Sequence, residues 1–269
     1  MDETRTAEAA ADNFATHVSW APSRIRGMRV AEDDGLLLVD SGLASDTFNV
    51  VCRSRLPQGN VAKRVREAID HFRRERRTFS WWTAPGDRPE GLAGLLVENG
   101  LRPAEVETGM WLDLDRLPIW PPPAGFDVRR VRTPAELGAV ARVIAANATP
   151  RDAAVERYFR LAAPFVLAND SPLSFFLGYL AGEPVAAAEI AAGESIDGLY
   201  GLSTIEAFRG RGFGGALTLA ALREARAAGR HTAVLQAAPA GVGLYRRIGF
   251  APFGEIVEYK PASREDERP

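Results

Sequence analysis

The stretch RGRGFGG, residues 209–215, places four glycines and two arginines within seven positions. Glycine destabilises ordered backbone by roughly 0.5–1 kcal/mol relative to alanine, so such a cluster is expected where something approaches the main chain closely. Free N–H groups at the start of a helix, together with the helix dipole, attract phosphate. Arg209 and Arg211 add charge and a planar fork that matches phosphate oxygens. The stretch predicts a site for a diphosphate or polyphosphate ligand; the alternative is a turn that only permits tight helix packing.

The spacing of these glycines narrows the class of ligand. They satisfy G-x-G-x-x-G, but a nicotinamide site also needs an acidic residue about 20 positions later. No Asp or Glu stands between Glu224 and Glu255, which argues against that cofactor. No G-K-S/T follows, so the stretch is not a P-loop. The same residues meet a second pattern, R-x-x-G-x-G, which begins at Arg209.

The segments around the stretch alternate between strand and helix, which predicts an α/β fold of layered sheet and helices. The glycine stretch lies between a strand and a helix, as a phosphate loop requires. We expect strands at 126–131, 173–180, 185–191, 195–205, 232–238 and 253–260, and helices at 134–149, 151–163, 213–228 and ending near 249.

In this order of elements, the chain resembles the GCN5-related N-acetyltransferase (GNAT) superfamily over about residues 126–260. RGRGFGGAL is similar to the family's pyrophosphate loop for coenzyme A, and LYRRIGF (244–250) to its late helix-to-strand segment. The resemblance implies acetyl-CoA as co-substrate and no metal. It implies that the pantetheine arm and thioester lie along a bulged, splayed strand. The cofactor-binding residues it implies are Leu202, Ser203, Thr204, Arg209, Gly210, Arg211, Gly212, Phe213, Gly214 and Gly215.

The resemblance also implies direct attack by an amine on the thioester, with backbone N–H groups stabilising the oxyanion. Tyr245 matches the family tyrosine that protonates the leaving thiolate; packing in the core is the alternative. The base that deprotonates the amine is open: Glu189 and Asp197 are candidates, although each is expected to be a surface-facing strand residue. Two departures from the family pattern are Ala238, where asparagine is common, and Gly241, where alanine is common.

The N-terminal half carries a fainter version of the same pattern. TFSWWTAP (78–85) and TAVLQAAP (232–239) each stand 23 residues after an arginine, and each is followed by a helix-like stretch and G-x-x-P. The stretch that corresponds to RGRGFG is RLPQGN, with one glycine, Gly59, and Leu96 stands where the second half has Tyr245. Chance similarity of short apolar words is the alternative. We predict two tandem acetyltransferase-like domains, each a mixed, mostly antiparallel sheet flanked by helices. The boundaries are a degenerate domain at 1–116, a Pro-rich linker at 117–125, the catalytic domain at 126–262 and a polar tail, expected to be disordered, at 263–269.

Composition limits the remaining classes of function. The hydrophobic fraction of 46% is typical of an ordinary globular protein. The net charge of −2 argues against nucleic acid as a partner. The chain has a single cysteine, Cys52, no apolar leader and no long apolar run. These features predict a cytoplasmic protein without membrane contact. The basic segment 63–77 reads as a helix with a solvated face, because Val61, Val65, Ala68, Ile69 and Phe72 share the other face. We expect Cys52 to be packed rather than reactive, and the scattered His17, His71 and His231 to hold no metal.

Three functions stay open at this level. The first is an acyl-CoA-dependent N-acyltransferase, most simply acetyl-CoA to an amine of a small molecule or peptide. The second is a non-catalytic acyl-CoA-binding sensor or interaction module, since the first half suggests a scaffold without the chemistry. The third is a nicotinamide-dependent oxidoreductase. The sequence pattern does not identify the amine acceptor or the oligomeric state.

Overall fold

The computed structural model describes residues 3–33, 35–147 and 152–262 of the chain, which divides into two compact units. Unit 1 consists of residues 1–108 and 253–269, and unit 2 of residues 109–252. The sequence-based boundary at 117–125 stays a prediction about functional domains. The compact units have other bounds, because the last strand, expected within 126–262, belongs to unit 1 from Phe253 onward. The expected polar tail, 263–269, lies outside the described residues.

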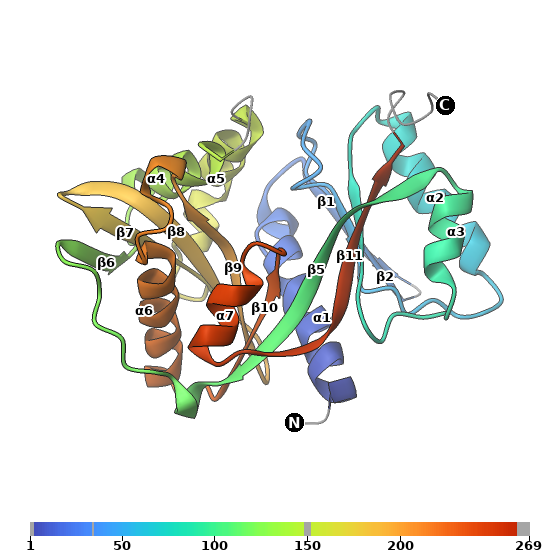
Figure 1. The fold of residues 1–269 in the computed structure, drawn as a ribbon. Helices are drawn as coiled ribbons and strands as arrows, with labels where there is room; N and C mark the ends of the chain where they lie inside the picture. The colour runs from blue at the N-terminus through green and yellow to red at the C-terminus, as the bar shows by residue number, and fades with distance from the viewer. Residues whose placement is uncertain (1–2, 34, 148–151, 263–269) are drawn as a thin grey trace. The chain divides into compact units, whose positions relative to one another are not determined.

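Unit 1 contains a sheet with the strand order β1-β2-β3-β4-β11-β5 (Figure 1). The β3–β4 pair is parallel, whereas β1–β2, β2–β3 and β4–β11 are antiparallel. The elements are α1 (Glu3–Ser19), β1 (Arg29–Asp33), β2 (Leu36–Asp40), β3 (Val50–Cys52), α2 (Val61–Arg74), β4 (Ser80–Thr83), α3 (Leu92–Glu98), β5 (Leu101–Asp113, of which 101–108 belong here) and β11 (Ala251–Pro261, from Phe253). A short 3-10 turn, Pro22–Arg24, precedes β1.

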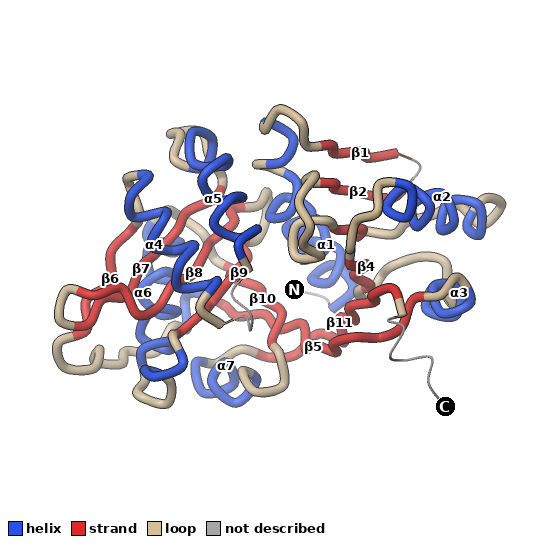
Figure 2. The backbone as a smooth tube through the Cα atoms, turned by 90° about the horizontal axis from the view of Figure 1, so that it is seen from above, coloured by secondary structure: helices blue, strands red, loops and turns tan. Residues whose placement is uncertain are grey.

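Unit 2 contains a sheet with the order β5-β10-β9-β8-β7-β6, and helices are seen on both of its faces (Figures 1 and 2). The β9–β10 pair is parallel, and β6–β7, β7–β8 and β8–β9 are antiparallel. The elements are the end of β5, a 3-10 turn (Leu114–Arg116), β6 (Phe126–Arg130), α4 (Pro134–Ala145), α5 (Ala153–Val166), β7 (Leu173–Leu180), β8 (Glu183–Ala192), β9 (Asp197–Thr204), a 3-10 turn η3 (Glu206–Phe208), α6 (Phe213–Ala227), β10 (Thr232–Ala237) and α7 (Val242–Ile248). The predicted α/β class with mixed, mostly antiparallel sheets is confirmed.

Each unit has an apolar core of its own. In unit 1 the predicted apolar face of α2 is buried, and Phe72 stacks on Phe79 with ring centroids 4.6 Å apart. The core of unit 2 includes Leu217 and Leu222 of α6, and Phe126 stacks on Phe213 at 4.7 Å. Burial of these apolar faces fixes the ends of the helices relative to the sheet of their own unit.

The start of α4 and the burial of Cys52 both follow the sequence pattern. Thr133 and Glu136 form a reciprocal capping box at the start of α4, with Pro134 in the first turn. Cys52 is buried in β3, and desolvation raises the pKa of its thiol, so it is packed as expected. Among the described residues, no helix is both long and apolar enough to cross a membrane.

Candidate functional site

A β-bulge interrupts β9 near its carboxyl end. On β8, Ala187 pairs with Ser203 and Glu189 pairs with Tyr200, so two steps along β8 face three along β9. The extra residue makes this a bulge, and Gly201, within it, has φ of +58°. A bulge redirects the backbone groups of the strand away from regular pairing.

Beyond the bulge, β9 also loses its parallel neighbour. Pairing with β10 runs from Asp197 opposite Ala233 to Leu199 opposite Leu235, and within the described residues it does not continue past that point. Although β9 is an interior strand, Gly201 is exposed and residues 202–204 are partly exposed. On the side of β10, the segment from Tyr200 to Thr204 therefore has no strand partner among the described residues.

The chain then enters α6 through a turn whose amide groups are left uncapped. Gly212 is the N-cap residue at φ +83°, and neither a side-chain cap nor an acidic residue lies in the first turn of this 15-residue helix. The first N–H groups of a helix have no intrahelical acceptor, and the helix dipole makes this end positive. The left-handed φ favours glycine at this position. The start of α6 is suited to an anionic group.

The other glycines of the stretch have separate reasons. A Cβ on Gly214 would lie 3.5 Å from Oγ1 of Thr204 and 3.9 Å from Cδ2 of Leu202, so both predicted strand residues face the start of α6. A Cβ on Gly215 would lie 3.1 Å from Cδ1 of Leu244 and 3.4 Å from Cζ3 of Trp120. Gly215 therefore has a packing role that is independent of any ligand, which is the alternative that the sequence left open.

The two arginines have different surroundings. Arg209 donates from Nε to the carbonyl oxygen of Thr204 over 3.1 Å, and its guanidinium also bonds Oδ1 of Asn147. Arg211 is exposed and lies over the ring of Phe213, 4.9 Å from its centroid. Arg209 thus ties the loop to the end of β9, while Arg211 keeps its hydrogen-bond donors toward solvent at the start of α6.

Tyr245 lies on α7, the helix that packs against the first turn of α6. Its side chain is 7% exposed, and its ring meets Phe250 edge-on at 5.7 Å. The preceding residue, Leu244, makes the contact with α6 described above, and Gly241 lets the tyrosine ring approach the N-cap of α7, since a Cβ there would lie 3.1 Å from Cε2. Tyr245 therefore directly follows the residue through which α7 contacts α6. The role of its phenol as an acid stays a prediction.

Glu189 is buried beside the bulge, which corrects the expectation that it faces the surface. Its side chain is 7% exposed, and it lies opposite Tyr200 on β9 and opposite Phe175 on β7. Burial raises the pKa of Tyr158 on α5, and the charge of Glu189 raises it further, so carboxylate and phenol are close. Phe175 contacts Phe159 of α5. Glu189 therefore lies on the face of the sheet that α5 covers.

Asp197 is also buried rather than surface-facing, but it serves the fold. It begins β9, at the end of the strand remote from the bulge. Nε of Arg230 lies 3.4 Å from its Oδ1, and the backbone N–H of Gly193 donates to the same oxygen over 3.3 Å. Burial raises the pKa of this carboxyl, partly opposed by Arg230. Of the two candidate bases, only Glu189 is near the bulge.

Three residues near the site were missed by reasoning from the sequence. Asn147 bonds Arg209, Trp120 contacts Gly215, and Cγ of Pro123 would lie 3.5 Å from a Cβ on Gly212. Trp120 and Pro123 belong to the segment expected to be a linker, and a tryptophan among prolines was the available signal. Within the described ranges, no group of three His, Cys, Asp or Glu side chains could hold a metal ion.

Comparison with known proteins agrees with this geometry. Residues 143–250 match the model of the acetyltransferase (GNAT) family. No curated protein sequence matches the chain. The matched segment contains β9, its bulge, the start of α6 and Tyr245.

Several solved structures share the fold. A GCN5-related N-acetyltransferase from Kribbella flavida is 22% identical, with a TM-score of 0.71, over 94% of this chain and 96% of that one. A GCN5-related N-acetyltransferase from Sphaerobacter thermophilus is 17% identical, with a TM-score of 0.59, over 96% and 92%. A tandem GNAT protein from the clavulanic acid biosynthesis pathway is 18% identical, with a TM-score of 0.53, over 88% and 79%.

Proposed function

Because residues 143–250 of this chain match the model of the acetyltransferase (GNAT) family, we propose that the protein transfers an acetyl group from acetyl-CoA to an amine. The observation that carries the proposal is the bulged end of β9, followed after the short turn η3 by the uncapped start of α6. One element offers backbone groups to a thioester, and the other offers N–H groups and positive potential to a diphosphate.

The same arrangement assigns binding roles to the predicted residues. The diphosphate of acetyl-CoA would bind the amide groups of residues 210–215, with Arg211 adding charge from the exposed side. The pantetheine arm would lie along Leu202, Ser203 and Thr204. Arg209, which bonds Thr204 and Asn147, would hold the loop in register with the strand.

The reaction then needs two proton movements. The amine nitrogen loses a proton and forms a bond to the thioester carbon, and an oxyanion develops on the carbonyl oxygen. The carbon–sulfur bond then breaks, and the thiolate of CoA takes up a proton. We assign the first proton to Glu189, directly or through water, because it is the buried carboxylate beside the bulge, and we assign Tyr245 as the donor of the second.

The first half of the chain supports a further part of the proposal. β2, β3, α2, β4 and α3 follow one another as β8, β9, α6, β10 and α7 do, with an antiparallel and then a parallel strand pair in each case. We propose that the first half is a degenerate copy that keeps the scaffold. One of the solved structures with the same fold is a tandem GNAT protein.

A release assay for the CoA thiol tests the activity. The protein is mixed with acetyl-CoA and a panel of amines that includes amino acids, polyamines, aminoglycosides and peptides with free N-termini. Amine-dependent thiol release supports transfer. Binding of acetyl-CoA without release across the panel would favour the sensor hypothesis instead, and absence of acetyl-CoA binding would contradict both.

A further inference from the structure

The Pro-rich segment, residues 117–125, is attached to α6 along most of that helix, although the sequence predicts only a linker. At one end, Nη2 of Arg223, in the second half of α6, donates to the carbonyl oxygen of Pro118 over 3.0 Å. At the other end, Cγ of Pro123 would lie 3.5 Å from a Cβ on Gly212, the N-cap of α6. The segment therefore runs alongside α6 in the opposite chain direction, and Figure 1 draws it in green beside that helix.

Between these two ends, Trp120 packs against the first turn of α6. Its Cζ3 would lie 3.4 Å from a Cβ on Gly215, and Cδ1 of Leu244 on α7 would lie 3.1 Å from the same atom. Trp120 is partly buried and packs against the core of unit 2. The indole and Leu244 thus meet α6 at the same residue, where glycine leaves room for both.

The end of the segment makes a further contact with the first turn of α6. The N–H of Phe126, the first residue of β6, donates to the carbonyl oxygen of Pro123 over 3.0 Å. The ring of Phe126 stacks on Phe213 with centroids 4.7 Å apart. Three residues at the start of α6 are therefore contacted by the Pro-rich segment and the strand that follows it.

These contacts lie where α6 is weakest by its own sequence. The N-cap is glycine, Gly214 and Gly215 follow in the first turn, and no side chain caps this end. Glycine destabilises a helix more than any residue except proline. Four of the nine residues of the Pro-rich segment are proline. Proline restricts the backbone, so this segment loses little conformational entropy when it packs against the helix.

We propose that the Pro-rich segment is a brace that holds the first turn of α6 in the geometry for binding a diphosphate, and that Trp120 is its main positioning residue. The inference rests on the proposed function, because it concerns the amide groups assigned to the diphosphate of acetyl-CoA. Trp120 acts through α6 and is assigned no contact with the ligand.

Hydrogen–deuterium exchange of the ligand-free protein tests the brace without any ligand. The N–H of Ala216 donates to Gly212 over 3.0 Å and is among the first hydrogen-bonded amides of α6. In Trp120→Ala, peptides that cover residues 213–220 should exchange at least fivefold faster than in the wild type. Peptides that cover β7 should stay within twofold. Unchanged exchange of residues 213–220, or an equal increase in β7, would overturn the inference, since the second result indicates a general loss of stability.

Binding of two ligands tests the link to the diphosphate. Trp120→Ala should weaken acetyl-CoA binding at least tenfold, measured by calorimetric titration. It should leave the affinity for acetyl-pantetheine, which lacks the diphosphate and adenosine, within twofold in a ligand-observed NMR titration. Trp120→Phe keeps an aromatic ring and should restore acetyl-CoA affinity to within threefold of the wild type. The matched control is Ile119→Ala, which changes the neighbouring residue of the same segment, 93% exposed, and should bind acetyl-CoA as the wild type does.

The outcomes separate this inference from the proposed function. Equal acetyl-CoA affinities of the wild type and Trp120→Ala, or an equal loss of affinity for both ligands, would overturn the positioning role while the proposed function stands. Absence of acetyl-CoA binding to the wild type would contradict the proposed function and the role in diphosphate binding with it. The exchange measurement would then still decide whether the segment braces α6.

Discussion

The segment before α2 in unit 1 and the segment before α6 in unit 2 occupy the same place in the order of elements. Residues 55–60 read RLPQGN, and residues 209–214 read RGRGFG. β3, which precedes the first segment, is fully buried and pairs with β2 without a shift of register. β9, which precedes the second, is bulged and partly exposed at its end.

Backbone N–H groups at the beginning of the first segment already form hydrogen bonds within unit 1. The N–H of Arg55 donates to the carbonyl oxygen of Gly35, and the N–H of Leu56 donates to that of Arg88 over 3.2 Å. The side chain of Arg55 pairs with Asp12 at 3.1 Å. Both helices begin without a side-chain cap and without an acidic residue in the first turn. The two segments therefore differ in the end of the strand and in the residues that lead to the helix, and we propose that this difference separates a scaffold from a site.

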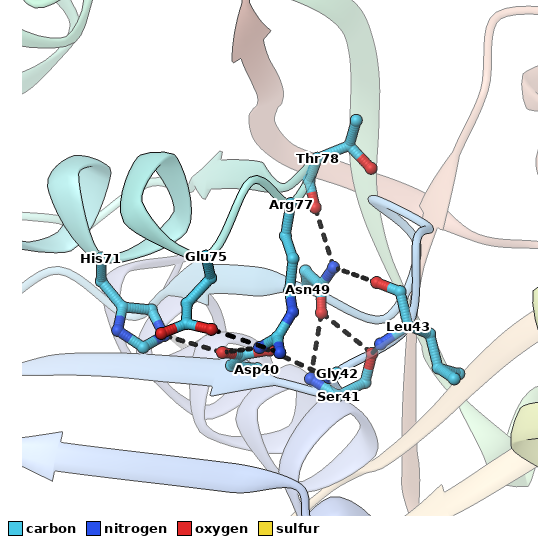
Figure 3. A network of polar contacts seen from close by, with 9 residues as sticks. All are labelled: Asp40, Ser41, Gly42, Leu43, Asn49, His71, Glu75, Arg77 and Thr78. Carbon is cyan, nitrogen blue, oxygen red and sulfur yellow. Dashed lines mark hydrogen bonds and ion pairs between the residues drawn. The ribbon is translucent and has the colours of Figure 1, made fainter.

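The largest expected effect concerns the scaffold of unit 1. Asp40 is buried and bonds both His71 and Arg77 (Figure 3). Asp40→Asn should lower the free energy of unfolding by about 3 kcal/mol, because it leaves Arg77 without its buried partner. Acetyl-CoA affinity at a temperature where the variant is folded should not change. Chemical denaturation and calorimetry measure the two quantities; a large loss of affinity would contradict the assignment of unit 1 as scaffold.

The same carboxyl gives a dependence on pH. Burial alone would raise the pKa of Asp40, but hydrogen bonds from Gly42, His71 and Arg77 outweigh it and the pKa is lowered. A folded pKa below the unfolded value of about 3.8 means that the stabilisation is present above that pH and is lost as the pH falls through the folded pKa. Wild-type stability should therefore decrease more steeply below pH 4 than that of Asp40→Asn.

At the start of α6, Gly212→Asp should weaken acetyl-CoA binding at least a hundredfold, about 2.7 kcal/mol. The substitution places a β-carbon on a residue with φ of +83° and a negative charge beside the expected diphosphate. Gly59→Asp, in the corresponding segment of unit 1, is the matched control, since a Cβ there meets nothing within 4 Å. Calorimetric titration of both variants with acetyl-CoA checks this prediction. Equal affinities of the two variants would contradict the assignment of the diphosphate site to the start of α6.

Beside the bulge, Glu189→Gln should lower turnover about a hundredfold while KM for acetyl-CoA stays within twofold. Amide nitrogen cannot accept the amine proton, and general-base catalysis contributes factors of about a hundred or more. Glu183→Gln, at the exposed start of the same strand, is the control. Unchanged turnover would remove Glu189 from the mechanism.

Tyr245→Phe should lower turnover about tenfold, the smallest effect of the series, because a thiolate is a fair leaving group without protonation. Leu96→Phe, at the corresponding position of unit 1, should leave turnover unchanged, since Leu96 is a fully buried core residue. Steady-state kinetics with the best amine of the panel measure both variants. Wild-type turnover by Tyr245→Phe would show that the tyrosine only packs against Phe250.

Much of this architecture could be predicted from local sequence. Periodicity predicted the buried face of α2, and the glycine stretch predicted a loop between a strand and the start of a helix. The burial of Glu189 and Asp197 was not predictable, because single charges in apolar strands do not reveal which neighbouring elements cover them. The separation of β11 from the rest of its half, and the contacts of Trp120 and Asn147, depend on pairing between distant parts of the chain, which no local pattern encodes.

Hydrogen–deuterium exchange with and without CoA tests the central claim most directly, because it reports on the backbone N–H groups themselves. Peptides that cover residues 210–216 should gain protection when CoA is added, and peptides that cover residues 56–62 should exchange at the same rate in both states. Protection confined to residues 56–62, or no change in either segment at saturating CoA, would contradict the account.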